Sequence, residues 1–319
     1  MRRNTRRHFL NQTGLAASGL LLARPTTAPW SLLTGRFGPN LRFPTAPQER
    51  IAIASYPFRE FIAGSEDVAA KSKTKMPLKD FAAHVSEKFQ IRKIEPWSKH
   101  FLSLEPVDLT ELRDTVAKCG GAIVNIAVDG EYSVYAAQSV EREKAVSFSK
   151  QWIDVAVAIG SPSVRTSISV AKDSEPDLER AAASLSEVAG YGASVGILVN
   201  LENDNPLSED PFFVAKIIER VNSPWLNALP DFGNSLAAHE GDYAYKGVGG
   251  MFAHAYNISH VKEIEPGENG RVAHVDLNKT FGIARAHGYH GYFSMEWDSP
   301  GDPYQGTAGL IEKTLKNLS

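Results

Sequence analysis

Four side chains that can bind a cation or move a proton each follow a short apolar run in the second half of the sequence. They are Glu202 in "GILVNLEN", Asp231 in "WLNALPDFGN", His260 in "NISHVKEI" and Glu296 in "GYFSMEWD". A carboxylate at the end of a buried strand is costly unless a cation, a metal or a substrate pairs with it. Three carboxylates together also raise one another's pKa values, and a divalent cation removes that repulsion. Three oxygen ligands with one imidazole suit Mn²⁺, Mg²⁺, Co²⁺ or Zn²⁺, so we expect a divalent metal ion as the cofactor.

Eight short β-rich runs alternate with longer amphipathic segments along the chain. The runs cover 51–58, 91–97, 122–129, 163–168, 196–203, 225–234, 257–264 and 291–298. This alternation predicts βαβ units with parallel strands, and eight such units favour an α/β fold of the closed (β/α)8 TIM barrel type. No glycine-rich phosphate-binding motif follows the first run, which argues against a Rossmann fold.

A barrel would bring the four side chains together, because catalytic groups in this fold lie at the carboxyl ends of the strands, on one rim. Neighbouring parallel strands are about 4.8 Å apart, so four successive strand ends can converge on one ion. Taken singly, each acid could instead cap the following helix, and a lone histidine is usually structural. Four such residues on four consecutive strands favour a shared site.

The N-terminal 28 residues have a pattern typical of an export signal. Residues 5–10, "TRRHFL", resemble the twin-arginine consensus, and the apolar stretch 14–23 is too short to span a bilayer. A basic, disordered tail is the alternative. We expect a signal peptide over 1–28, a linker over 29–48 and one barrel domain over 49–319. The protein would then be periplasmic or otherwise exported by the twin-arginine machinery, with no stable membrane span.

Composition limits the partners of this chain. Of its 319 residues, 43% are hydrophobic and 22% are charged, which is ordinary for a globular domain with a large core. The first 28 residues hold five arginines and no acids, so their removal leaves 29 basic and 37 acidic residues and changes the net charge from −3 to −8. An acidic body is a poor nucleic-acid binder. Cys119 is the only cysteine, which excludes an intramolecular disulfide.

The sequence resembles the sugar isomerase/epimerase superfamily of xylose isomerase-like TIM barrels over most of its length. The motifs that carry the resemblance are "LEN" at 201–203, "DFGN" at 231–234, "HVKE" at 260–263 and "MEW" at 295–297. By this resemblance Glu202, Asp231, His260 and Glu296 would be the metal ligands. Glu202 and Glu296 would also be the acid/base pair on opposite faces of a sugar. Members of the superfamily are often dimers or tetramers, which implies that this chain can form homo-oligomers.

Six more residues are expected to contact the substrate. They are Glu95, Trp97, Arg165, Asn234, Lys262 and Trp297. Glu95 and Trp97 could hold hydroxyls and stack on a sugar face, or could simply pack the rim. Arg165 and Lys262 could polarise a substrate oxygen, although a structural salt bridge is an equal alternative for Arg165. Asn234 stands where epimerases of the superfamily often have histidine.

The resemblance implies an enzyme that acts on a small carbohydrate by proton transfer next to a metal-bound carbonyl, with one glutamate removing the proton and the other returning it. An exported enzyme meets few sugar phosphates, so we expect a free sugar, a keto-sugar or an oxidised glycoside. A keto-glycoside lyase or hydrolase with the same chemistry is the main alternative. An endonuclease IV-like phosphodiesterase is less favoured by the net charge, and a non-catalytic carbohydrate-binding barrel by the presence of both glutamates.

Overall fold

A computed structural model describes residues 38–64, 75–239, 241–267 and 272–319. The expected signal peptide over 1–28 and the first part of the expected linker lie outside these ranges. The rest of that linker contacts the domain, since the ring of Phe43 meets those of Tyr256 and Tyr292 edge-on at centroid distances of 5.5 and 5.7 Å. The packed part of the chain therefore begins before residue 49.

Parallel strands form the centre of the fold and occupy all eight expected runs. They are β1 (Ile51–Ala54), β2 (Lys93–Glu95), β3 (Ala122–Ile123), β4 (Ala127–Val128), β5 (Ser163–Thr166), β6 (Leu198–Glu202), β7 (Leu226–Leu229), β8 (Ile258–Val261) and β11 (Tyr292–Met295). Strands β3 and β4 divide the third expected run between them. The strand order is β3-β2-β1-β11-β8 in one sheet and β4-β5-β6-β7 in the other, and the pairings within both sheets are parallel.

The two sheets join at two seams and so close into a barrel. At one seam Trp97, just after β2, bridges to Ala127 of β4. At the other seam Asp231, just after β7, bridges to His260 of β8, where the His260 N–H donates to the Pro230 carbonyl at 3.0 Å. The chain is therefore a TIM barrel, which confirms the expected fold class.

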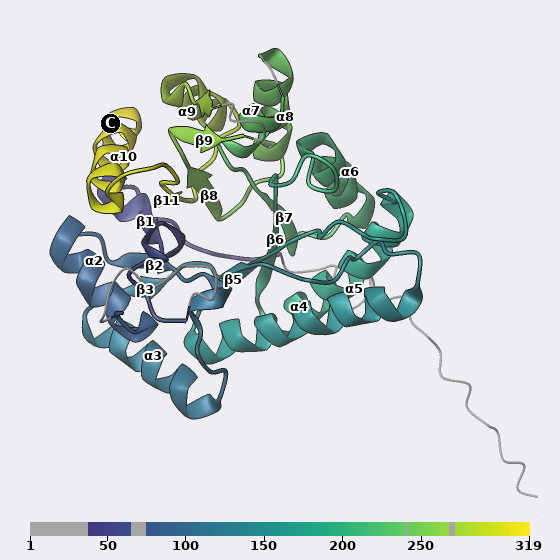
Figure 1. Ribbon diagram of the computed structural model, residues 1–319, viewed down its shortest axis with the longest axis horizontal. Helices are drawn as coiled ribbons and strands as arrows, with labels where there is room; N and C mark the ends of the chain where they lie inside the picture. Colours follow the sequence, from purple (N-terminus) through teal and green to yellow (C-terminus); the bar gives the residue numbers. More distant parts are fainter. Residues whose placement is uncertain (1–37, 65–74, 240, 268–271) are drawn as a thin grey trace, which may run out of the picture.

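Helices surround the strands in chain order (Figure 1). They are α2 (Phe81–Phe89), α3 (Pro106–Lys118), α4 (Ser139–Ile159), α5 (Leu178–Val195), α6 (Pro211–Val221), α7 (Asn234–Ala238), α8 (Asp242–Phe252), α9 (Leu277–Ala286) and α10 (Pro303–Leu318). Short 3₁₀ helices are η1 (Pro47–Arg50), η2 (Tyr56–Phe58), η3 (Leu78–Asp80) and η4 (Ser98–His100). Within the described ranges, none of the helices has the length and apolarity needed to cross a bilayer.

Local signals set the helix ends. The side chains of Asp177, Asp210 and Asp302 accept hydrogen bonds from backbone N–H groups in the first turns of α5, α6 and α10. Gly160 and Gly196 follow the last residues of α4 and α5 with φ of 74° and 79°, a left-handed conformation that glycine adopts without steric cost. These residues therefore mark the starts of α5, α6 and α10 and the ends of α4 and α5 in the sequence itself.

The helical layer buries the strands, which explains why they are largely apolar rather than alternating. All residues of β1, β5, β6 and β8 are buried. The polar residues within these strands, among them Arg165, Glu202 and His260, are therefore removed from bulk water and need partners inside the protein or on a ligand.

An antiparallel pair of strands follows β8 and was not expected from the sequence. Strand β9 (Ile264–Pro266) pairs with β10 (Val272–His274). The sequence predicts a seventh strand that continues to Ile264, but β8 ends at Val261 and the chain leaves the barrel wall at Lys262, whose side chain is held by carboxylates at the rim. Because the chain leaves the barrel wall here, β9 lies beside the rim, and its residues Glu265 and Pro266 line the pockets described below.

Close packing of α8 on α6 requires glycine at position 247. A Cβ atom at Gly247 would lie 2.4 Å from Cγ and 3.0 Å from Cβ of Pro211. We expect Gly247→Ala to lower the free energy of unfolding by about 1–3 kcal/mol, because the helices must separate to admit the methyl group. Urea denaturation followed by circular dichroism measures this change.

Gly250 is the matched control for that substitution, since it lies on the same helix and a Cβ there meets nothing within 4 Å. Gly250→Ala should leave stability unchanged or raise it by up to about 1 kcal/mol through helix propensity. Equal stabilities of the two variants would show that α8 does not pack on α6 as described.

Candidate active site

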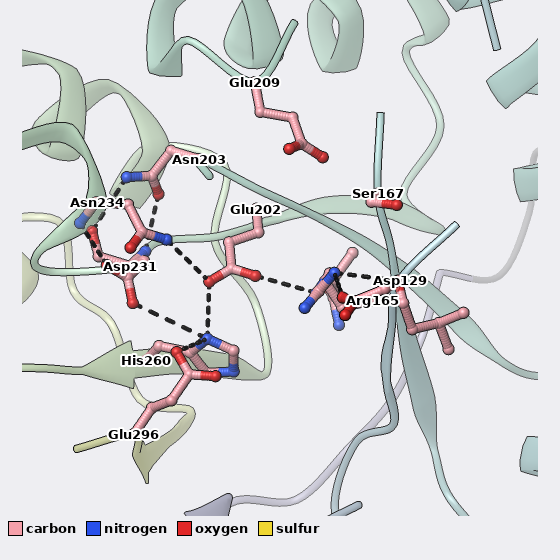
Figure 2. A network of polar contacts seen from close by, with 12 residues as sticks. Asp129, Arg165, Ser167, Glu202, Asn203, Glu209, Asp231, Asn234, His260 and Glu296 are labelled. Carbon is pink, nitrogen blue, oxygen red and sulfur yellow. Dashed lines mark hydrogen bonds and ion pairs between the residues drawn. The ribbon is translucent and has the colours of Figure 1, made fainter. Parts of the chain in front are cut away.

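His260 on β8 has carboxylates on both sides of its ring, and Figure 2 shows those of Glu202, Asp231 and Glu296 on one side. Its Nδ1 atom lies 2.8 Å from Glu202 Oε1, 3.1 Å from Glu296 Oε2 and 4.0 Å from Asp231 Oδ2. Its Nε2 atom lies 2.9 Å from Glu95 Oε2. These five side chains are each at most 7% exposed, so the group is shielded from bulk solvent.

Four neighbouring strands supply the groups around Nδ1 at their carboxyl ends. Glu202 is the last residue of β6, and Glu296 directly follows β11. Asp231 follows β7 and is bridged to His260 of β8. One ligand atom from each of the four residues lies within 4.8 Å of the others. The structure therefore brings together the residues that the sequence predicts to share a metal site.

The buried carboxylate of Asp231 indicates that this cluster fits a cation. Its Oδ1 atom accepts two hydrogen bonds of 2.7 Å, from the backbone N–H groups of Gly233 and Asn234. Its Oδ2 atom is buried without a hydrogen-bond partner among the described residues, and Lys262 Nζ lies 3.6 Å from it. Burial, together with the charges of Glu202 and Glu296, raises the pKa of Asp231 to about 8 against the opposing charge of Lys262. A divalent ion among three carboxylates and one imidazole would satisfy the Oδ2 atom of Asp231 and favour the ionised form.

Opposite charges are paired within the cluster. Burial lowers the pKa of His260, but the carboxylates of Glu296, Glu95 and Glu202 outweigh it and raise that pKa well above its ordinary value. Burial opposes ionisation of Glu296, yet the charges of His260 and Lys262 keep the pKa of Glu296 below its usual range. An imidazole can coordinate a metal only through an unprotonated nitrogen, so an ion at Nδ1 would take the place of a proton.

Glu95, the last residue of β2, lies behind His260 rather than on the open rim. It is fully buried, both of its oxygens are within 3.0 Å of His260 Nε2, and its Oε1 accepts a 2.7 Å hydrogen bond from Asn125 Nδ2. A carboxylate that accepts a hydrogen bond from Nε2–H leaves Nδ1 facing the other three acids, as in carboxylate–histidine–metal arrangements. Glu95 was expected to contact the substrate. In the structure its carboxylate is fully buried behind His260 and has no surface open to a ligand.

Each of the two glutamates expected to move protons has its own cation. Arg165 Nε lies 3.0 Å from Glu202 Oε2, and Arg165 Nη1 lies 2.9 Å from Asp129 Oδ1. Lys262 Nζ lies 3.2 Å from Glu296 Oε2 and also contacts Glu265 at 3.1 Å. Both cations are at most 7% exposed, and the pKa of each lies well above its ordinary value because the nearby acids outweigh the effect of burial. Both therefore remain charged.

Asn234 connects the two halves of this network. Its Oδ1 accepts a 2.8 Å hydrogen bond from Lys262 Nζ, and its Nδ2 lies 3.5 Å from Glu202 Oε1 as a long hydrogen bond. The same residue begins α7, directly after the loop that carries Asp231. An amide that can both donate and accept can serve both sides at once, which a histidine at this position could do only in one tautomer.

A cavity of about 190 Å³ opens over the cluster, and we call it the inner pocket. Six acids line it: Asp129, Glu202, Asp204, Glu265, Glu296 and Asp298. The other lining residues are Tyr56, Trp97, Arg165, Asn234 and Lys262. Four of the six residues expected to contact substrate thus line the inner pocket, Glu95 lies behind His260, and Trp297 lines an adjoining cavity.

The inner pocket also contains residues that the sequence analysis did not select. Asp129 ends the third expected run and accepts a 2.7 Å hydrogen bond from Trp97 Nε1, so its position at a strand end was a usable signal. Tyr56 follows the first strand and donates to Asp298 at 3.3 Å. Glu265 carried no such signal, because it comes from β9, which lies outside the barrel.

Comparisons with known proteins identify the family of this chain and support its fold. The family model of the xylose isomerase-like TIM barrel matches residues 86–317. No sequence among the curated proteins matches significantly. Similar solved structures include D-allulose 3-epimerase from Methylomonas sp. (TM-score 0.63, 16% identity, covering 86% of this chain and 98% of that one). A second is 3-keto-D-glucoside 4-epimerase from E. coli (TM-score 0.62, 12% identity, covering 83% of this chain and 98% of that one). A third is a xylose isomerase-like TIM barrel protein from Mycobacterium smegmatis in complex with magnesium (TM-score 0.60, 17% identity, covering 85% of this chain and 98% of that one). At these identities the likeness concerns the fold.

The contact between Glu95 and His260 yields a test of the metal site. Glu95→Gln removes the charge that fixes the Nε2–H proton while keeping nearly the same shape. We expect its affinity for Mn²⁺ to fall by about 10- to 100-fold, as is typical when the outer partner of a ligating histidine is replaced. Isothermal titration of the metal-free protein with MnCl₂ measures this.

Glu87→Gln is the matched control, because it makes the same change of charge at a side chain on α2 that is 76% exposed. Its Mn²⁺ affinity should equal that of the wild type. An unchanged affinity in Glu95→Gln as well would show that Glu95 does not orient a metal-binding histidine.

Proposed function

The chain belongs to the xylose isomerase-like TIM barrel family, and from that premise we propose that it is a divalent-metal-dependent isomerase or epimerase of a carbohydrate. The reaction is proton transfer at the carbon next to a sugar carbonyl. The observation that carries the proposal is the pair Glu202 and Glu296, which both line the inner pocket and both lie within 3.1 Å of His260 Nδ1. The names of two structural neighbours, an allulose 3-epimerase and a keto-glucoside 4-epimerase, support the same class of reaction.

Glu202, Asp231, His260 and Glu296 would hold the ion. When bound there, a divalent cation polarises a carbonyl and lowers the pKa of the neighbouring C–H group. The proton transfers and the hydrogen bonds to the substrate would be made by protein side chains.

Two carboxylates suffice for the proton transfers. Lys262 lies 3.2 Å from Glu296 Oε2, and a bound divalent ion would take the place of the proton on His260, so Glu296 would be ionised and could accept a proton from carbon. Glu202, the second carboxylate at the same pocket, would carry the proton that is returned to the other face of that carbon, as inversion requires, and proton exchange with solvent would then reset the two glutamates. Lys262 remains cationic beside both Asn234 and Glu296, where it can donate a hydrogen bond to a substrate oxygen that gains negative charge.

The charge of the inner pocket indicates an uncharged substrate. Six acids line it against the two cations Arg165 and Lys262, and both cations already pair with acids. Even with a divalent ion present, the acids outnumber the positive charges, so a phosphate or carboxylate group would be repelled. A free sugar, a keto-sugar or an oxidised glycoside has no such charge.

The same features weigh against phosphodiester cleavage. A nucleic acid would bring phosphates into this acidic pocket. Among the described residues, the metal-binding side chains form one group, of Glu202, Asp231, His260 and Glu296, whereas a multi-metal cluster would need further ligands. A keto-glycoside lyase or hydrolase, which would use the same proton abstraction, is the remaining alternative.

Export through the twin-arginine pathway is a further part of the proposal and rests on the sequence "TRRHFL" at 5–10. Replacing both Arg6 and Arg7 by lysine should retain the full-length chain in the cytoplasm of a host that has this pathway. Cell fractionation and immunoblotting measure the distribution. Equal export of the wild type and the double variant would contradict a twin-arginine signal.

Glu296→Gln tests the proton-transfer role. We expect a loss of turnover of about 10²–10⁴-fold with the fold retained, because the substitution removes a base. The measurement is loss of the C–H signal in ¹H NMR when D-fructose, D-tagatose or D-allulose is incubated in D₂O with the Mn²⁺-loaded protein. Metal content measured on the same samples separates loss of the base from loss of the ion.

Glu263→Gln provides the control, because Glu263 pairs with Lys313 away from the inner pocket. Its exchange rate should equal that of the wild type. A near-normal rate in Glu296→Gln with metal bound would remove the proton-transfer assignment.

A further inference from the structure

A second, larger cavity adjoins the inner pocket. Its volume is about 760 Å³, and we call it the outer pocket. Its wall includes Pro57, Arg59, Phe61, Pro266, Trp297 and Asp298. None of these residues is among the proposed metal ligands, so the proposed reaction leaves the cavity unexplained.

The two pockets are neighbours in the structure. Asp298 lines both of them. At three places the chain lines the inner pocket with one residue and the outer pocket with the next: Tyr56 and Pro57, Glu265 and Pro266, and Glu296 and Trp297. A ligand that occupied both pockets would therefore pass beside Asp298.

The outer pocket has the chemistry of a sugar subsite. Trp297 is held against α10, because a Cβ atom at Gly306 would lie 2.2 Å from the indole ring and only glycine leaves room for it. Trp297 and the partly exposed Phe61 offer aromatic surfaces on which the C–H face of a pyranose can stack. Prolines 57 and 266 add rigid apolar surface at no cost in side-chain entropy.

A polar contact stands between the two pockets. Arg59 Nη2 lies 2.9 Å from Asp298 Oδ1, and the Arg59 guanidinium lies 4.3 Å from the centre of the Tyr56 ring. The side chains of Arg59 and Asp298 are 31% and 20% exposed, so both can still reach a ligand. This pair can hydrogen-bond to hydroxyls or to a bridging oxygen at the junction of two sugar rings.

Size separates the possible substrates. The inner pocket, at about 190 Å³, is smaller than the about 300–1,000 Å³ of typical ligand sites and has room for a single sugar ring. A free monosaccharide would leave the outer pocket empty. We propose that the substrate is a two-ring glycoside, with the carbonyl-bearing sugar in the inner pocket and a second sugar ring against Trp297 and Phe61 in the outer pocket. This assignment of substrate class rests on the proposed function.

Keto-disaccharides provide the test. Lactulose, palatinose and turanose each carry a fructose unit joined to a second hexose at a different position, and D-fructose is the single-ring reference. With the Mg²⁺-loaded full-length chain, saturation-transfer NMR should show contact of both rings with the protein for at least one disaccharide. The kcat/KM for C–H exchange of that sugar in D₂O should exceed that of fructose by about tenfold.

Phe61→Ala should lower kcat/KM for the preferred disaccharide by about tenfold, lower it less for fructose, and weaken saturation transfer to the second ring. Leu102→Ala is the control, since Leu102 is 72% exposed and lies outside both pockets, and it should change neither measurement. Absence of transfer to the second ring in all three disaccharides, or equal effects of Phe61→Ala on both substrate sizes, would overturn the inference.

The two proposals fail in different ways. Exchange in fructose without contact to any second ring would leave the proton-transfer reaction standing and remove the outer subsite. Contact of both rings with no exchange in any of the sugars would establish the subsite and remove the reaction.

Discussion

Charge balance at one rim of the barrel is the constraint on which the rest of the site depends. Six carboxylates line a pocket of about 190 Å³, with Glu95 and Asp231 buried beside it. Such a concentration of acids destabilises a fold unless opposing charges are fixed among them. His260, Lys262 and Arg165 supply those charges, each in contact with at least two acids. Among the residues that the structure describes, none gives a hydrogen bond to Oδ2 of Asp231, and a metal ion there would complete the balance.

The barrel makes this arrangement possible at the seam where its two sheets meet. Between β7 and β8, pairing is reduced to isolated bridges, one of them between Asp231 and His260. The side chain of Asn203 replaces backbone pairing at this point: it accepts a hydrogen bond from the Asp231 N–H at 2.8 Å and donates one to the Asp231 carbonyl at 3.1 Å. The backbone N–H and carbonyl of Asp231 are therefore satisfied without continuous strand pairing.

Residues outside the barrel wall shape the site above this cluster. Glu265 on β9 contributes an acid to the inner pocket, and Pro266 beside it faces the outer pocket. Trp297 directly follows a proposed metal ligand and packs on α10. The division is typical of barrels, in which the strands hold the reactive groups and the loops at the same end determine what can bind.

Much of this could be predicted from the sequence, because the signals are local. Eight apolar runs separated by amphipathic segments determine a barrel, and acids or histidine at the ends of four runs must then share one rim. Glu202, Asp231, His260 and Glu296 were identified in that way, and the structure brings them within 4.8 Å of one another. Only the tertiary structure decided the role of Glu95, since its partner His260 is 165 residues away. It also decided the pockets, because their walls combine distant segments whose contacts depend on how the chain closes, and no local pattern encodes that closure.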